Sequence, residues 1–270
     1  MVADNEEFDP AAYWEKRLAR RGSVKTTGLS HLSLSFNRWI YLLRRTIFKR
    51  ALADTTVRTA GCRVLDVGSG GGFYIRQWNK AGVDDVTGVD ISPSAVRRLR
   101  TRFPDTWFEV ADAADGLRHV GEGFDAVSMF DVVYHVMDDA RYRAVFAGIY
   151  DVLAPGGWFL FSENFIHAPS RHGRHFVARS IEETQSAVTD AGFEIVRRLP
   201  MFVLMNIPVD SRHAWQPALW RKITPLLKHE RGGMLIGAAL YPVDRLLTKV
   251  LSESPTTEVM VCRKPLDAAS

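Results

Sequence analysis

The sequence predicts an α/β protein in which helices cover both faces of a mainly parallel sheet. Short runs rich in β-branched and aromatic residues alternate with helix-like segments from residue 62 to residue 198, with little padding between them. Consecutive parallel strands need a crossover connection each time, so this alternation is typical of a doubly wound sheet. The first run also ends in a cluster of glycines, at the sheet edge where such folds bind nucleotides.

Length and composition are those of a globular chain with one elaborated domain. Of the 270 residues, 46% are hydrophobic and 24% are charged, a balance that excludes a disordered chain. Only two cysteines occur, which excludes a disulfide scaffold and a cysteine-based zinc cluster. No apolar run approaches the ~18 residues that span a bilayer, and the acidic N-terminus lacks the apolar stretch of a secretory signal. We therefore expect a cytoplasmic protein.

The elements of the core can be placed in order along the chain. The predicted strands span residues 62–67, 86–90, 107–111, 124–130, 158–162 and 193–198, and the helices begin near 73, 92, 141 and 180. Ser92 is a good N-cap with proline after it, and Ser180 with Glu183 forms a capping-box pattern. Pro155-Gly156-Gly157 is expected to separate a helix from the fifth strand. A last strand, 258–263, follows a 45-residue helical insert that is too long to be a bare loop.

Three parts are predicted. Residues 1–60 form an N-terminal helical lid or substrate segment, residues 61–204 plus 252–270 form the core, and residues 205–251 form a helical insert expected to cover the substrate pocket. Both added segments are basic: residues 1–60 carry 11 Lys and Arg against 6 Asp and Glu, and residues 205–251 carry 7 against 3. This excess indicates either ordinary solvated helices or attraction to an anionic partner.

The most informative stretch is the glycine-rich loop Asp-Val-Gly-Ser-Gly-Gly-Gly at residues 66–72, directly after the first strand. Glycines at this position let the backbone approach a ligand closely. Asp90 ends the second strand, twenty residues beyond Gly70, where a carboxylate can accept hydrogen bonds from both hydroxyls of a ribose. The loop and this acid together predict a nucleotide site.

The kind of nucleotide follows from the residues around the loop. Phe73 stands where a dinucleotide fingerprint requires its third glycine, and the Gly-Lys-Ser/Thr of a phosphate-binding loop is absent. Asp66, just before the loop, would repel a pyrophosphate but suits a ligand with a cationic sulfonium and an amino group. Asp112, at the end of the third strand, can accept a hydrogen bond from the exocyclic amine of adenine.

These motifs together resemble a class I S-adenosylmethionine-dependent methyltransferase. The resemblance covers roughly residues 60–200 and 257–264 and is carried by segments 66–72, 88–92, 111–113, 124–131 and 153–157. It implies a Rossmann-like seven-stranded sheet of order 3-2-1-4-5-7-6 with strand 7 antiparallel, S-adenosyl-L-methionine as cofactor and S-adenosyl-L-homocysteine as product. In that family the glycine loop holds the methionine end, the second-strand acid holds the ribose and the third-strand acid holds the adenine. The residues so implied are Asp66, Gly68, Ser69, Gly70, Gly72, Asp90, Ile91, Asp112, Ala113 and Phe130.

An aromatic segment near the N-terminus resembles another element of that family, a helix that closes over the cofactor. Tyr13 and Trp14 begin this segment, and we expect them to contact the cofactor. Ordinary packing of an amphipathic helix explains the same pattern equally well.

The acceptor side is predicted from residues that follow the fourth and fifth strands. His135 is the leading general base, because its ordinary pKa of ~6.5 permits proton uptake at neutral pH, although a histidine that only caps the turn fits the same position. Asp131 and His167 complete the predicted catalytic set. With Glu163 and Asn164, Asp131 only distantly resembles the oxygen ligands of metal-assisted catechol methyltransferases, so we expect no metal.

These features predict an enzyme that methylates a small molecule, by O-methylation of a sugar, lipid-linked or secondary-metabolite hydroxyl. Residues 131–134 lack the prolines of enzymes that methylate exocyclic amines of nucleic-acid bases, which makes nucleic acid an unlikely partner. The alternative is an RNA- or protein-directed methyltransferase-like module whose basic flanks bind a macromolecule. The apolar face of segment 234–251 is expected to pack on the sheet, so membrane contact would be at most peripheral. The oligomeric state stays open.

Overall fold

The computed structural model describes residues 9–19, 27–57 and 61–266 and contains a seven-stranded sheet of order β3-β2-β1-β4-β5-β9-β8. The strand order predicted from the sequence is confirmed. Strand β9 runs antiparallel to both β5 and β8, while the pairs of β1, β2, β3, β4 and β5 are parallel. The strands are β1 Arg63–Val67, β2 Asp85–Asp90, β3 Trp107–Val110, β4 Phe124–Met129, β5 Leu153–Glu163, β8 Glu194–Pro200 and β9 Glu258–Arg263.

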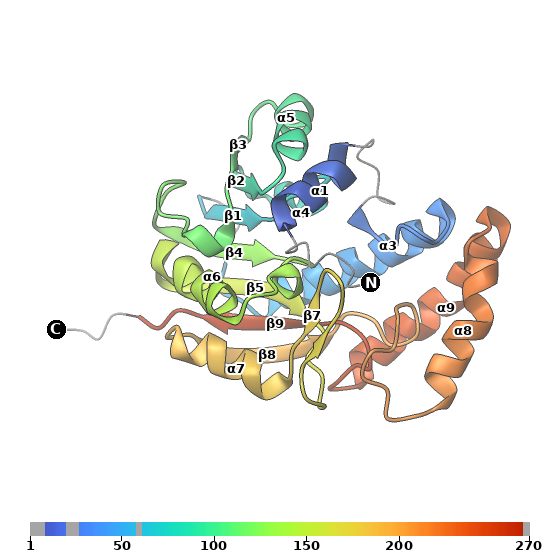
Figure 1. The fold of residues 1–270 in the computed structure, drawn as a ribbon. Helices are drawn as coiled ribbons and strands as arrows, with labels where there is room; N and C mark the ends of the chain where they lie inside the picture. Colours follow the sequence, from blue (N-terminus) through green and yellow to red (C-terminus); the bar gives the residue numbers. More distant parts are fainter. Residues whose placement is uncertain (1–8, 20–26, 58–60, 267–270) are drawn as a thin grey trace, which may run out of the picture.

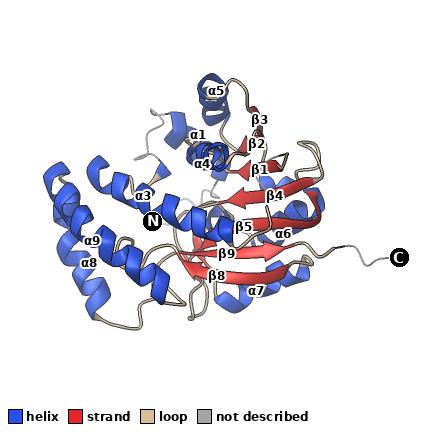
Figure 2. Ribbon diagram, turned by 180° about the vertical axis from the view of Figure 1, so that it is seen from behind, coloured by secondary structure: helices blue, strands red, loops and turns tan. Residues whose placement is uncertain are grey.

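Helices cover both faces of this sheet (Figures 1 and 2). One core contains residues of α3, α4 and α5 and the other contains residues of α6 and α7. Adjacent strand residues alternate between them, since Val64 belongs to the first core and Leu65 to the second. The helices of this part are α1 Pro10–Ala19, α3 Leu34–Ala53, α4 Phe73–Ala81, α5 Pro93–Arg102, α6 Asp139–Val152 and α7 Ile181–Asp190.

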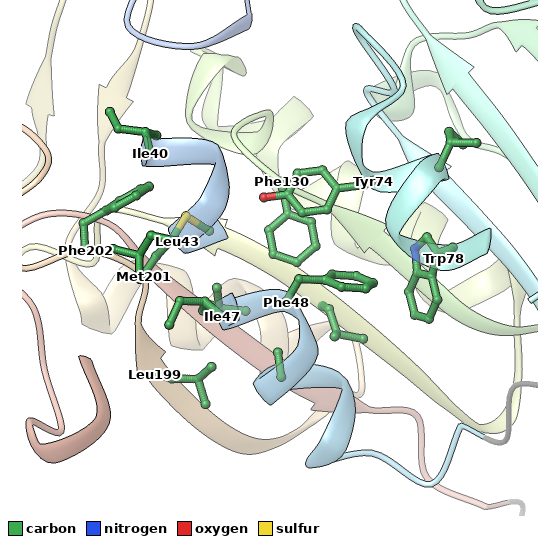
Figure 3. Packing of buried hydrophobic residues seen from close by; sticks show 14 of the residues in the cluster. Ile40, Leu43, Ile47, Phe48, Tyr74, Trp78, Phe130, Leu199, Met201 and Phe202 are labelled. Carbon is green, nitrogen blue, oxygen red and sulfur yellow. The ribbon is translucent and has the colours of Figure 1, made fainter. Parts of the chain in front are cut away.

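Helix α3 fills the centre of one face (Figure 3). The ring of Phe48 stands edge-on to Trp78 of α4, with centroids 4.9 Å apart, and Ile40, Leu43 and Ile47 lie toward the segment that follows β8. Because α3 is buried on this side, the N-terminal segment is part of the core packing, and its other side chains are held in fixed positions near the site.

Local signals correctly placed the helix starts. The side chain of Ser92 accepts a hydrogen bond from Ala95 N at the start of α5, and the side chain of Ser180 accepts one from Glu183 N at the start of α7. The reciprocal half of the predicted capping box does not form, since Ser180 N donates to Ser170 Oγ instead. Residues 155–157, which were expected to separate a helix from the fifth strand, belong to β5 itself. A register shift against β4 and a positive φ of 77° at Gly156 let the strand include them.

The insert forms α8, Trp215–Leu227, and α9, Glu230–Val250, at the margin of the molecule (Figures 1 and 2). The apolar face of segment 234–251, which was expected to pack on the sheet, is mostly exposed, because α9 packs against α3 with its other side. The contact uses small residues: a Cβ on Gly233 would lie 2.0 Å from Ser33 Oγ, and one on Gly237 would lie 2.3 Å from Trp39 Cδ1. None of the described helices is both long and apolar enough to cross a membrane.

Candidate active site

A cavity of about 700 Å³ opens at the carboxyl ends of the parallel strands. Its walls bring together the glycine loop, the ends of β2 and β4, helix α1 and one side of α3. Eleven of the predicted site residues line it: Trp14, Gly68, Ser69, Gly70, Asp90, Ile91, Asp112, Ala113, Phe130, Asp131 and His135. The remaining four, Tyr13, Asp66, Gly72 and His167, lie outside this lining.

The glycine loop needs its glycines for two different reasons. Gly68 has φ 72°, and a Cβ there would lie 2.2 Å from Val132 Cγ2, so only glycine allows the loop to pass under the residues after β4. Gly72 has φ 73° and precedes α4, where a Cβ would lie 2.4 Å from Phe103 Cε2. Gly72 therefore serves close packing between the loop and α5, which explains why it does not line the cavity.

Asp90 ties the loop to the second strand. Its Oδ2 accepts from Gly70 N at 2.7 Å and its Oδ1 accepts from Ser92 N at 2.9 Å. Burial raises the pKa of this carboxyl, whereas the two backbone donors lower it. Each carboxylate oxygen has a second lone pair, so Asp90 retains acceptor capacity for ribose hydroxyls on the cavity side.

Asp66 occupies a different environment from the one its place in the motif suggested. The carboxyl is 2% exposed, its Oδ1 accepts from Ser128 Oγ at 2.6 Å, and burial raises its pKa to about 7. Asp66 thus joins β1 to β4 through Ser128, and its backbone carbonyl accepts from Ser69 Oγ of the loop.

Asp112 caps the short helix η1, Ala113–Asp115, by accepting from Ala114 N. Its other oxygen accepts from Arg141 at 2.9 Å, and Arg141 also lines the cavity. The sequence offered no signal for Arg141, because the two residues are 29 positions apart and meet only when α6 packs beside η1.

Helix α1 closes the cavity from the side of α5. Trp14 lines the cavity with its ring edge-on to His135, the centroids being 4.7 Å apart. Tyr13 stacks on His175 at 5.2 Å, in the loop between the short strands β6, Arg171–His172, and β7, Val177–Ala178. Of the two predicted aromatic residues, Trp14 is therefore placed to meet a ligand, and Tyr13 is placed to hold the helix down.

Glu15 fastens the same helix to α5. Its carboxylate accepts hydrogen bonds from the hydroxyls of Ser92 and Ser94 and from Ser94 N, at the positive end of the α5 dipole. The bonds from Ser92 and Ser94 lower the pKa of Glu15 to about 2, so the carboxylate stays ionised at any pH used for assay. Glu15 stood inside the aromatic segment but was not selected from the sequence.

We expect the variant Glu15→Ala to bind S-adenosylmethionine about tenfold more weakly, because α1 loses the contact that holds Trp14 over the cavity. Calorimetric titration and the rate of proteolysis near residue 19 measure the two effects. Lys16→Ala, on the exposed side of the same helix, serves as the control. Unchanged affinity in Glu15→Ala would show that α1 does not act as a lid.

His135 lies in the short helix η2, Val133–His135, and has a defined tautomer. Its Nδ1 lies 2.7 Å from the carbonyl oxygen of His175, and because a carbonyl can only accept, Nδ1 carries the proton. Nε2 then holds the free lone pair. Burial lowers the pKa of His135 to about 4, so the ring is neutral at pH 7.

A buried ion pair between Arg44 of α3 and Asp131 forms part of the cavity wall. The two side chains are 7% and 14% exposed, and Tyr41 lies beside the guanidinium, 5.0 Å from Cζ to the ring centroid. Asp131 also has φ 59°, an uncommon conformation for a residue other than glycine, and its N–H donates to Ser162 Oγ. Arg44 was missed because nothing in its helical segment indicates which side faces the sheet edge.

His167 belongs to a separate charged cluster. Its Nδ1 lies 2.6 Å from Asp210 and its Nε2 lies 3.5 Å from Glu253, in the connections around β8 and β9. A catalytic role at this cavity is therefore not supported by its position. Glu163 is fully buried, with a pKa raised to about 8 by burial, and the described residues contain no group of three or more potential metal ligands.

Comparisons with known proteins agree with this fold. Residues 64–157 match the family model described as a methyltransferase domain. A ubiquinone biosynthesis O-methyltransferase of Thiobacillus denitrificans is 35% identical over 114 residues, which are 40% of this chain and 47% of that relative. The chain thus spans about half the length of the curated relatives it matches.

Two solved structures share the fold over nearly the whole chain. The N-methyltransferase NodS of Bradyrhizobium japonicum WM9, in complex with S-adenosyl-L-homocysteine, is 16% identical with a TM-score of 0.56, covering 95% of this chain and all (100%) of that one. The magnesium protoporphyrin IX methyltransferase of Synechocystis PCC 6803, with its bound cofactor, is 13% identical with a TM-score of 0.58, covering 97% and 100%.

Three features together indicate the class of this protein: the sheet order, the glycine loop after β1, and the acids that end β2 and follow β3. Residues 64–157 form a methyltransferase domain by the matched family model, and the strand order of the sheet is that of the class I, S-adenosylmethionine-dependent methyltransferases.

Proposed function

We propose that this protein transfers the methyl group of S-adenosylmethionine to a hydroxyl of a small molecule. One observation carries the proposal: the neutral His135, the Arg44–Asp131 pair and nine of the twelve predicted cofactor residues line the same cavity. The cavity therefore has a donor side, formed by the glycine loop, and an acceptor side, formed by residues after β4 and on α3. The relative from Thiobacillus denitrificans is an O-methyltransferase, which supports oxygen as the acceptor atom.

The residues on the donor side fit the cofactor. Gly68 and Gly70, with φ 72° and 50°, present backbone to the cavity, and Asp90 and Asp112 offer carboxylate oxygens at the ends of β2 and β3. In the proposed complex the loop holds the methionine end, Asp90 the ribose and Asp112 the adenine, and Asp66 supports the loop through Ser69. When bound, the cofactor supplies an electrophilic methyl group on a sulfonium.

The residues on the acceptor side supply alignment and a base. Nε2 of His135 can accept the hydroxyl proton, because Nδ1–H is held by the His175 carbonyl. The hydroxyl of Tyr74 is buried without a hydrogen-bond partner among the described residues, although Tyr74 lines the cavity, so a bound molecule can satisfy it. Arg44 and Asp131 form a polar wall that helps to orient the acceptor for in-line attack.

His135→Gln is expected to lower kcat by about 100-fold, the lower range for the loss of a general base, with cofactor affinity unchanged. The wild-type rate depends on neutral His135, and the folded-state pKa of about 4 lies below the ordinary 6.5, so activity should persist as pH falls and be lost only near pH 4. The pH profile of kcat/KM measures the pH at which activity is lost on the acid side.

The exposed His172→Gln is the matched control, since it removes a nearby imidazole that does not line the cavity. An acid limb near pH 6.5, or full activity in His135→Gln, would contradict a role for His135 as base.

The proposed function is tested by methyl transfer from isotopically labelled S-adenosylmethionine to a panel of phenol, sugar and lipid-linked hydroxyl compounds. Phenols come first, because the relative's name points to a quinone pathway. Incorporation into a hydroxyl compound supports the proposal. Cofactor binding with labelling only of RNA or protein would instead favour the macromolecular alternative.

A further inference from the structure

Helices α8 and α9 each expose a row of apolar side chains. Along α9 the row is Leu235, Ala239, Val243, Leu246 and Val250, and along α8 it is Trp215, Leu219 and Leu226. The members lie three, four or seven residues apart, so each row follows one side of its helix. Leu235, Leu246 and Val250 are 67%, 59% and 65% exposed. We call these rows together the α8–α9 face.

The packing of α9 against the rest of the protein keeps its row of large apolar side chains exposed to solvent. The buried side of the helix consists of Gly233, Gly237, Asp244 and Thr248, which lie against α3 or the segment after β8. The carboxylate of Asp244 accepts from the N–H groups of residues 203, 204 and 205, and Arg50 of α3 donates to Thr248 O. Rotation of α9 to bury its leucines would break all these bonds and remove a contact that only glycine permits.

The charges of segment 205–251 are arranged unevenly around this face. Its three acidic residues are all engaged with the protein: Asp210 with His167, Glu230 with the first N–H groups of α3, and Asp244 as described. Six of its seven basic residues are exposed and form no ion pair among the described residues. These six are Arg221, Lys222, Lys228, Arg231, Arg245 and Lys249.

Four of the six cations lie within or beside the apolar rows. Lys222 lies in the α8 row between Leu219 and Leu226, since it follows Leu219 by three residues. Arg245 and Lys249 follow Arg231 by 14 and 18 residues, which are close to whole numbers of helical turns. The three cations therefore lie on one border of the α9 row. An apolar centre with a basic border is the pattern of helices that lie in a membrane interface.

We propose that the α8–α9 face docks this protein on the surface of an anionic lipid bilayer. Both views place the two helices at the outer margin of the molecule (Figures 1 and 2). Charge complementarity selects the occupant. A second copy would bring six unpaired cations against the same six, and a nucleic acid would leave the rows of leucine and valine uncovered. The inference does not depend on methyl transfer.

Co-sedimentation with vesicles tests it, with phosphatidylcholine vesicles compared to vesicles containing about 30% phosphatidylglycerol. The full chain should bind the anionic vesicles and be released as sodium chloride rises from about 0.1 to about 0.5 M. Arg245→Gln with Lys249→Gln should lower the partition coefficient about 30-fold, because each basic residue near the surface contributes about fivefold. Leu235→Gln with Leu246→Gln should lower it at least about tenfold by removing inserted apolar area.

Matched controls lie outside the α8–α9 face, on α4 and β3. Lys80→Gln on α4 removes an exposed cation and Trp107→Gln on β3 removes an exposed apolar residue, and both should bind vesicles like the wild type. Circular dichroism and S-adenosylhomocysteine affinity should be unchanged in every variant. Equal binding to neutral vesicles, no binding to either kind, or full binding by the leucine variant would overturn the proposal. A dimer in light scattering that the leucine variant dissociates, or displacement of vesicles by RNA, would overturn it as well.

Discussion

Replacement of Asp90 by alanine is expected to weaken S-adenosylmethionine binding by at least about 100-fold, equivalent to about 3 kcal/mol. Two losses combine in this variant. The ribose hydroxyls lose a charged acceptor, and Gly70 N and Ser92 N lose the carboxylate that holds the glycine loop against β2. Calorimetric titration with S-adenosylhomocysteine measures the change in affinity, and circular dichroism shows whether the fold is retained.

Asp85→Ala provides the matched control, because Asp85 begins the same strand, is exposed, and among the described residues forms only an ion pair at 3.4 Å with Arg63. Asp90→Asn separates the two losses, since its amide keeps one acceptor for a backbone donor while it removes the charge. If Asp90→Ala bound the cofactor as tightly as Asp85→Ala, the proposed donor side of the cavity would be wrong.

Arg44→Met is expected to reduce the free energy of unfolding by about 3 kcal/mol, because it leaves the Asp131 carboxylate almost buried without its partner. The apolar stem of methionine preserves much of the packing against Tyr41 and Phe202. Urea unfolding followed by circular dichroism measures the loss. The exposed neighbour Arg45→Met should change the stability by less than about 0.5 kcal/mol.

A double variant identifies the cause of this loss. Arg44→Met with Asp131→Asn removes both charges, and asparagine tolerates the positive φ of 59° at this position. We expect the double variant to regain more than half of the lost stability while it remains inactive, because the polar wall of the cavity is gone. An additive loss in the double variant would mean that the pair is not coupled.

Much of the fold was predictable because its determinants are local. Strand β1, the helix 73–81 and the N-caps at Ser92 and Ser180 follow from short patterns of hydrophobicity, glycine and serine. The order of the sheet followed from a resemblance carried by five short motifs, and the structure confirms it. The prediction that residues 155–157 separate a helix from the fifth strand was wrong, because β5 already begins at Leu153. An irregularity in its pairing with β4 lets the strand continue through these residues.

The candidate site was only partly predictable. Gly68, Asp90 and Asp112 lie where a strand ends, so their place at the sheet edge follows from topology alone. Arg44, Glu15 and Arg141 are helix residues whose partners are 87, 77 and 29 positions away. No local pattern indicates which side of a helix meets a distant loop, so these three could be found only in the folded chain.

The sequence by itself determined the sheet, the glycine loop and the class of cofactor site, because these depend on residues close together in the chain. Only the tertiary structure decided three further points. It paired Arg44 with Asp131, it gave His135 its tautomer and lowered pKa, and it turned the apolar side of α9 outward. The last point has a simple physical reason: glycines allow α9 to approach α3 more closely than leucines could, so the small residues face inward and the large ones face solvent.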